Sequence, residues 1–199
     1  MLKKISSLNN LSTELSIKKP TILGIDGKDG SGKSTLARKL ATALNMTCIH
    51  IDSFIKSKNC DSYITALDLE KIDCHIQESK YPIIIEGICL LEILQTLKLK
   101  PDIYIYVKKI TSQGLWCDQD ICDIEENTDV DTHIAELERQ LNDFIDIMSN
   151  DIDKSDDSSL PEIEKEQIRY HHKYRPQIHA DYVFLRSENE DRSEEHTSE

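Results

Sequence analysis

The sequence predicts an α/β protein with a three-layer fold, in which helices cover both faces of a five-stranded, mainly parallel sheet. Two observations indicate this class. Short apolar segments of strand length alternate along the chain with longer segments whose apolar residues recur at helical spacing, which is typical of βαβ units. A glycine-rich segment also separates the first buried strand from the helix that follows it. This context is that of the P-loop NTPase fold.

The expected elements follow in chain order. An amphipathic helix is expected over residues 1–19, because leucine and isoleucine recur at helical spacing before Pro20. The five expected strands cover residues 21–26, 47–51, 82–87, 102–107 and 181–185. Helices are expected up to residue 44, over 61–79 and 88–97, after residue 130, and over 161–174. The strand over 82–87 is continuously apolar before its final acid, which suits a central position in a parallel sheet.

We expect one P-loop domain over residues 20–187. Residues 150–160 are rich in Asp and Ser and are expected to form an acidic, mobile loop. The tail 188–199 is expected to be disordered. We interpret residues 192–199 as an assembly artefact, because the sequencing-adapter codons AGA TCG GAA GAG CAC ACG TCT GAA would encode them. Their charges therefore carry no functional weight.

Composition excludes two classes of partner. The formal net charge is −13, and segments 150–166 and 187–199 contribute −5 each. The remaining body is near neutral and lacks the clustered Lys and Arg of a nucleic-acid-binding surface. No apolar run approaches the length of a membrane span. The six cysteines show no C-x-x-C pair, so we expect free thiols in a reducing, cytoplasmic setting.

The segment Gly27–Ser34 reads GKDGSGKS and fills the pattern G-x-x-x-x-G-K-[ST]. Glycines let the backbone curl so that its N–H groups face phosphate oxygens, and the following helix offers its positive end. Lys33 is expected to reach the β- and γ-phosphates, and the Ser34 hydroxyl to ligate Mg²⁺. The residues predicted to bind the nucleotide are Gly27, Lys28, Asp29, Gly30, Ser31, Gly32, Lys33, Ser34 and Thr35.

Acidic residues lie at the expected carboxyl ends of three strands, where ligands bind in open α/β sheets. Asp52 is the predicted catalytic base, which accepts the proton of an attacking hydroxyl, and its alternative role is a helix N-cap. Glu86 is the predicted second metal ligand, or it orients the substrate. Its alternative is a carboxylate satisfied by backbone N–H groups. Asp26 is expected to brace the backbone of the loop.

These residues resemble the uridine kinase-like branch of P-loop kinases, which also contains phosphoribulokinases. The resemblance rests on the segments 25–35, 52–54, 83–87, 170–176 and 180–184. It implies that Asp52 is the base toward a sugar hydroxyl and that Glu86 lies at the metal and substrate site. It also implies that basic residues on a lid close over the phosphates.

Further candidates are less specific. Arg169 and Arg175 are predicted phosphate-binding cations of the lid, although each also suits the end of a helix. Asp61, Tyr63 and His171 are predicted substrate contacts. Each has an ordinary structural alternative, a helix cap for Asp61 and core packing for Tyr63 and His171.

The function that the sequence favours is an ATP- and Mg²⁺-dependent kinase. The γ-phosphate would pass to a hydroxyl of a nucleoside such as uridine, or of a related small metabolite. The alternative is a nucleotide-hydrolysing switch or regulatory ATPase that acts on a protein partner. A GTPase is disfavoured because the sequence contains no N-K-x-D string. The acceptor, the preference for ATP over GTP and the oligomeric state are left open.

Overall fold

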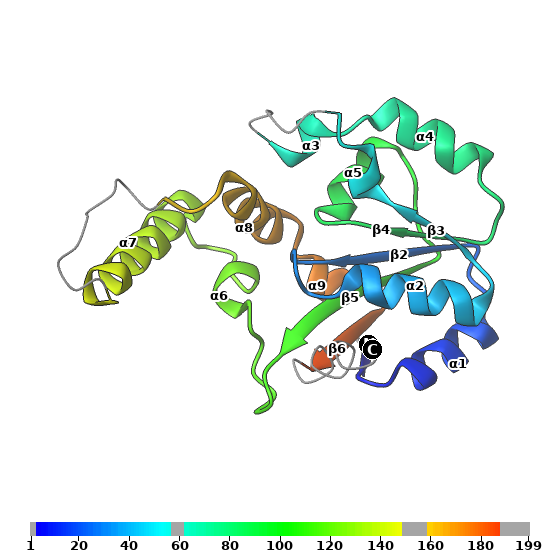
Figure 1. Cartoon of the computed structure of the whole chain (residues 1–199), viewed down its shortest axis with the longest axis horizontal. Helices are drawn as coiled ribbons and strands as arrows, with labels where there is room; N and C mark the ends of the chain where they lie inside the picture. The colour runs from blue at the N-terminus through cyan, green and yellow to red at the C-terminus, as the bar shows by residue number, and fades with distance from the viewer. Residues whose placement is uncertain (1–2, 57–61, 149–158, 188–199) are drawn as a thin grey trace, which may run out of the picture.

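The computed structural model describes residues 3–56, 62–148 and 159–187, and in these residues it shows a single twisted sheet flanked by helices (Figure 1). The described strands pair in the order β1-β6-β5-β2-β4-β3, and every pair is parallel. The strands are β1 (Lys3–Ile5), β2 (Ile22–Gly27), β3 (Thr47–His50), β4 (Ile83–Glu86), β5 (Ile103–Ile110) and β6 (Tyr182–Ser187). The predicted three-layer α/β class is confirmed.

Helices connect the strands and cover both faces of the sheet (Figure 1). The longer helices are α1 (Leu8–Lys18), α2 (Lys33–Leu44), α4 (Leu69–Glu78), α5 (Leu90–Thr96), α7 (Val130–Met148) and α8 (Glu162–Tyr174). Four-residue helices are α3 (Tyr63–Ala66), α6 (Gln119–Cys122) and α9 (Pro176–His179), and η1 (Ile51–Phe54) is a 3₁₀ turn. No helix in the described part of the chain has both the length and the apolar character that crossing a bilayer requires.

Two apolar clusters lie on opposite faces of the sheet, as alternation along the strands dictates. On β4, Ile84 packs with α1 and α2, whereas Ile83 and Ile85 pack with α4 and α5. On β5, Ile105 belongs to the first cluster and Tyr104 to the second. Both faces of the central strands are therefore covered, which explains their continuous apolar sequences.

The number of strands and the start of the first helix need correction. The sequence predicts five strands and a helix over residues 1–19, but Lys3–Ile5 forms a sixth strand parallel to β6. Ile5 is buried in the same apolar cluster as Leu11. Its distance from the leucines that follow matches a helical repeat, although it lies in a strand. The helix begins only at Leu8, where the Ser7 hydroxyl accepts a hydrogen bond from the Asn10 N–H.

The helix predicted over residues 61–79 is also divided in two. Leu67 is extended, and the Asp68 carboxylate starts α4 by accepting a hydrogen bond from the Lys71 N–H at 3.1 Å. The short helices α6 and α9 are absent from the prediction. Most of the expected acidic loop 150–160, and the entire tail 188–199, lie outside the described residues.

Helices α7 and α8 form an arm beside the sheet, and α7 points away from it (Figure 1). Ile134 of α7 and Ile168 of α8 pack together with Ile124. The Lys165 ammonium lies 2.9 Å from the Glu138 carboxylate and adds an ion pair between the two helices. The inner face of α8 returns to the sheet, so this helix touches both α7 and the loop that follows β2.

Candidate active site

The loop between β2 and α2 has the curled backbone that the glycine pattern predicts. Gly30 and Gly32 have φ angles of 73° and 90°, in the left-handed region that favours glycine. Gly32 is the N-cap of α2. A Cβ atom at Gly32 would lie 2.4 Å from Nη1 of Arg186, so the Arg186 side chain would have to move, and the positive φ angle strains any larger residue. The open N–H groups at the start of α2 suit an anion.

Two polar side chains of the loop are buried without a strong partner. Lys33 is 4% exposed, and its ammonium lies 4.0 Å from the Asp29 carboxylate. The Ser31 hydroxyl is buried and forms no hydrogen bond within the described structure. Buried polar groups are normally satisfied, so these two fit a ligand that brings oxygen acceptors. Phosphate oxygens supply such acceptors.

The loop residues before Ser31 are held by α8 and its neighbours. The Asp29 N–H donates to the Gln167 side chain at 2.9 Å. The Lys28 ammonium lies 3.6 Å from the Asp118 carboxylate and 3.5 Å from the Glu164 carboxylate. The side chain of Lys28 is therefore engaged with α8 and the segment before α6, and only its backbone belongs to the curled loop.

Ser34 and Glu86 meet at the first turn of α2. The Ser34 hydroxyl donates to Oε2 of Glu86 at 3.1 Å, and the Glu86 carboxylate is 1% exposed. A hydroxyl beside a carboxylate is a set of hard oxygen donors that suits Mg²⁺. The described residues contain no cluster of three or more His, Cys, Asp or Glu side chains that could hold a metal. Beside nucleotides, however, Mg²⁺ is commonly bound by few protein ligands together with phosphates, and these two residues fit that arrangement.

Asp52 lies in η1, directly after β3, and its side chain is exposed. Its Oδ1 atom accepts a hydrogen bond from the Tyr63 hydroxyl at 2.5 Å. Tyr63 is itself fixed by Glu166 of α8, whose carboxylate accepts hydrogen bonds from the backbone N–H groups of Tyr63 and Ile64. The other carboxylate oxygen of Asp52 accepts no hydrogen bond from the residues that the structure describes. Within the described residues, Oδ2 is the Asp52 oxygen that remains for a ligand.

Asp26 braces the loop, as expected. It is fully buried, and its Oδ1 accepts the Gly27 N–H at 2.6 Å. The hydroxyls of Tyr104 and Tyr170 both donate to Oδ2. Burial raises the pKa of Asp26 to about 6, although the tyrosine and backbone hydrogen bonds and nearby Lys33 oppose this shift. Both oxygens are occupied by the protein's own donors, so Asp26 has no free atom for a substrate.

The structure gives His171 a place in the core. Its ring is 2% exposed, Nδ1 donates to the Gln167 carbonyl at 2.7 Å, and Nε2 therefore accepts from the Tyr106 hydroxyl at 2.7 Å. Burial lowers the pKa of His171 to about 4. With both nitrogens engaged, this side chain has no atom left for a substrate.

The remaining candidates are not brought to the loop. Arg169 pairs with Asp131 of α7 at 3.0 Å, and Arg175 pairs with Glu126 at 3.3 Å. Both cations therefore face the arm and the segment before it in this conformation. Asp61 lies outside the described residues.

Three residues that sequence reasoning missed contribute to the site. His50 donates from Nδ1 to Oε1 of Glu86 at 2.5 Å, and its place at the carboxyl end of a predicted strand could have identified it. Gln167 gives no sequence signal, because it is 138 residues from the loop N–H that it binds. Arg186 lies on β6 beside the loop. With Gly32 and Thr35 it lines a cavity of about 150 Å³.

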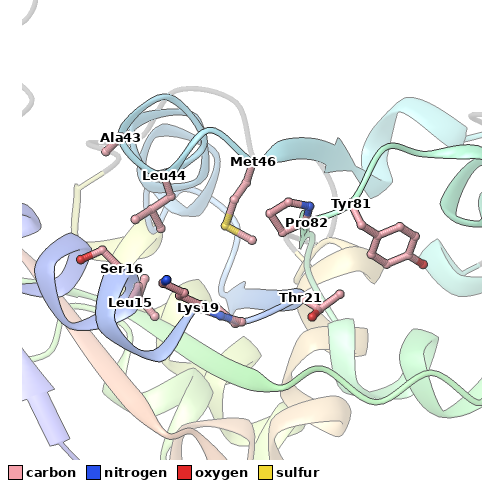
Figure 2. A pocket seen from close by; sticks show the side chains of 10 residues that line it. Leu15, Ser16, Lys19, Thr21, Ala43, Leu44, Met46, Tyr81 and Pro82 are labelled. Carbon is pink, nitrogen blue, oxygen red and sulfur yellow. The ribbon is translucent and has the colours of Figure 1, made fainter.

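A wider cavity lies at the opposite edge of the sheet and does not belong to this site. Its volume is about 590 Å³, and its lining comes from the ends of α1 and α2 and from the starts of β2 and β4 (Figure 2). Leu15, Leu44 and Met46 provide much of the apolar wall. The loop, Asp52 and Glu86 instead follow the carboxyl ends of the strands. The candidate active site is therefore placed at these groups, whatever the size of the other cavity.

Comparisons with known proteins concern the fold. No protein-family model and no curated protein match the sequence. A possible uridine kinase from Bacillus stearothermophilus is 17% identical, with a TM-score of 0.49 over 89% of this chain and 98% of that chain. Shikimate kinase from Bacteroides thetaiotaomicron is 15% identical, with a TM-score of 0.35 over 83% and 86% of the two chains. The function is therefore inferred from the site itself.

Proposed function

We propose that this protein is a small-molecule kinase that transfers the γ-phosphoryl group of ATP to a hydroxyl. The observation that carries the proposal is the convergence of three groups at one edge of the sheet. These are the phosphate-binding loop with buried Lys33, the Ser34–Glu86 pair, and Asp52 at the end of the neighbouring strand. Nucleotide binding alone requires the first group, whereas an exposed carboxylate after the strand that pairs with β4 suits transfer to an acceptor.

Each group has a role in this reaction. The loop N–H groups and Lys33 hold the β- and γ-phosphates and neutralise their charge. Ser34 and Glu86 would hold Mg²⁺, which when bound would supply further charge neutralisation at the phosphates. Oδ2 of Asp52 accepts the proton of the acceptor hydroxyl as its oxygen bonds to the γ-phosphorus. The bond between the γ-phosphorus and the β–γ bridging oxygen breaks, and ADP leaves.

Two further features support the assignment of donor and compartment. The cavity of about 150 Å³ beside Gly32 and Thr35 lies next to the loop, where the nucleoside part of the donor would follow its phosphates. The guanidinium of Arg186 is a planar group suited to stacking against a base. All described cysteines are free, which supports a reducing compartment such as the cytoplasm.

The acceptor that we propose is a nucleoside of the uridine class or a related metabolite with a free hydroxyl. The sequence resemblance to uridine kinase-like proteins supports this choice. Tyr63, a predicted substrate contact, is 8% exposed and is bonded to Asp52. Its hydroxyl is therefore a partner of the catalytic base Asp52. Other side chains recognise the nucleobase or sugar ring of the acceptor.

The test is ADP release from Mg·ATP across a panel of nucleosides and sugars, with wild type beside Asp52→Asn. We expect turnover that depends on one acceptor and falls about 1,000-fold or more in the variant, because the proton loses its acceptor. Hydrolysis that needs no acceptor and is unchanged in Asp52→Asn would indicate a nucleotide-hydrolysing switch. Asp123→Asn is a suitable control, since Asp123 follows α6 outside the site.

A further inference from the structure

His50 and Glu86 are direct neighbours across two parallel strands. β3 pairs with β4 in a register that aligns His50 with Glu86, and both residues end their strands. Parallel pairing directs the side chains of aligned residues to the same face of a sheet. The sequence thus places an imidazole beside the carboxylate that faces the phosphate-binding loop.

The contact between the two side chains has a defined direction. Nδ1 of His50 lies 2.5 Å from Oε1 of Glu86. A carboxylate oxygen accepts hydrogen bonds, so the ring carries its proton on Nδ1 and donates it. Oε2 of the same carboxylate accepts the Ser34 hydroxyl at 3.1 Å. One oxygen of Glu86 is therefore held by β3, and the other is presented to α2.

We propose that His50 is a positioning residue for Glu86. By holding Oε1, it fixes the rotation of the carboxylate so that Oε2 stays directed at Ser34 and at the Mg²⁺ that accompanies the nucleotide. This role rests on the proposed function, in which Ser34 and Glu86 hold that metal. Residues that orient metal ligands in this way typically change metal affinity by about 10–100-fold when they are replaced.

Packing does not account for His50 equally well. Its side chain is 35% exposed, whereas Ile49 and Ile51 on either side of it are fully buried in the core. A residue kept only for its apolar contacts would gain more from a buried position. The polar contact with Glu86 is the feature that an imidazole supplies at this place and a phenyl ring cannot.

The test measures metal binding rather than turnover, so it needs no acceptor. Mn²⁺ serves as the probe, and free Mn²⁺ is followed by its electron paramagnetic resonance signal in the presence of the ATP analogue AMP-PNP. His50→Phe keeps a ring and removes the donor, whereas His50→Asn keeps an N–H near the position of Nδ1. His179→Phe is the matched control, because His179 ends α9 on the surface. Thermal unfolding of each variant checks that it is folded.

We expect His50→Phe to raise the Kd of Mn²⁺ about tenfold. His50→Asn should stay within about threefold of wild type, and AMP-PNP affinity without metal should be unchanged in both variants. Equal Mn²⁺ affinity in wild type and His50→Phe would overturn the positioning role while leaving the proposed function intact. Equal losses in the Phe and Asn variants, or a loss of metal-free AMP-PNP binding, would assign His50 a structural role instead. A wild-type protein that binds no AMP-PNP would overturn the proposed function itself.

Discussion

Two buried carboxylates on neighbouring strands have opposite surroundings. Asp26 on β2 and Glu86 on β4 are 0% and 1% exposed, and Glu86 is aligned with Ile25, the residue before Asp26. Asp26 accepts hydrogen bonds from two tyrosine hydroxyls and a backbone N–H. Glu86 accepts hydrogen bonds from one imidazole and from the hydroxyl of Ser34, which lies on α2 directly after the loop.

The difference shows that burial alone does not identify a catalytic acid. The partners of Asp26 belong to β5, α8 and the loop backbone, so its bonds join parts of the fold. The partner of Glu86 on α2 is a hydroxyl that can turn its lone pair to a metal. A carboxylate whose hydrogen-bond partner can also ligate a metal is suited to a metal site. A carboxylate whose oxygens are all occupied by fixed donors is suited to stabilising the fold.

The largest effect on activity that separates the two acids is expected for Glu86→Gln. An amide keeps the shape of the side chain but removes the negative charge that attracts Mg²⁺. We therefore expect kcat to fall about 100-fold and the half-maximal rate to require more Mg²⁺. Steady-state kinetics over a Mg²⁺ series checks this. The free energy of unfolding near pH 7 should change little. A Glu86→Gln variant with wild-type kinetics would contradict the metal assignment.

Asp26 should control stability instead. Because the pKa of Asp26 is raised to about 6 in the folded protein, the folded state binds the proton more tightly than the unfolded state. Stability is then greatest below the ordinary pKa near 4 and is lost as pH rises through about 6. In wild type we expect the free energy of unfolding to fall by roughly 2 kcal/mol between pH 4 and pH 7. Asp26→Asn removes this ionisation, so the fall should become smaller. Urea unfolding from pH 4 to 7 measures it.

The control for that experiment is Asp102→Asn. Asp102 is an exposed carboxylate whose Oδ2 accepts the N–H groups of Thr21 and Ile22. Its replacement reports the effect of losing a carboxylate that the protein does not bury. Parallel pH profiles for wild type and Asp26→Asn would show that Asp26 titrates normally in the folded protein.

Tyr63→Phe sharpens the comparison at the acceptor side of the site. Loss of one hydrogen bond to Asp52 should lower kcat about tenfold, with little change in the KM for ATP, because the Tyr63 hydroxyl bonds Asp52 and not a loop residue. In an Asp52→Asn background the same change should have almost no further effect on kcat. Tyr81→Phe, at the distant cavity, is the matched control. Fully additive losses in the double variant would assign Tyr63 a role separate from the base.

The smallest effect is expected for Gln167→Ala. The Gln167 side chain accepts a hydrogen bond from the Asp29 N–H at 2.9 Å, so it holds the loop through its backbone. We expect the KM for ATP to rise about threefold, because the loop loses one neutral hydrogen bond that organises it. Binding of AMP-PNP, followed by calorimetry, checks the change. A loss of activity larger than that of Glu86→Gln would reverse the expected order of the two effects.

Much of this site could be predicted from local sequence, because its first components are local. The loop is one continuous segment, and Asp52 and Glu86 follow apolar strands whose carboxyl ends share one edge. Ser34, Lys33 and Glu86 required no knowledge of long-range contacts beyond the parallel sheet. The same reasoning predicted the bracing role of Asp26, which directly precedes the loop.

The missed features depend on pairing between distant segments. The strand Lys3–Ile5 pairs with the distant strand β6, and three residues carry too weak a pattern to predict a strand. His171 and Arg169 lie within one turn of α8, but one faces the core and the other the arm, and only packing decides which. Gln167 and Glu166 act on segments more than 100 residues away. No periodicity in the chain encodes such contacts.

The central claim is that the γ-phosphoryl group reaches an organic hydroxyl. Phosphorus NMR of a reaction with Mg·ATP and uridine, or the acceptor selected from the panel, tests it most directly. We expect a phosphate monoester signal that grows in equal measure with ADP, and that is absent in Asp52→Asn. ADP that appears together with inorganic phosphate alone, at the same rate in wild type and Asp52→Asn, would contradict the claim.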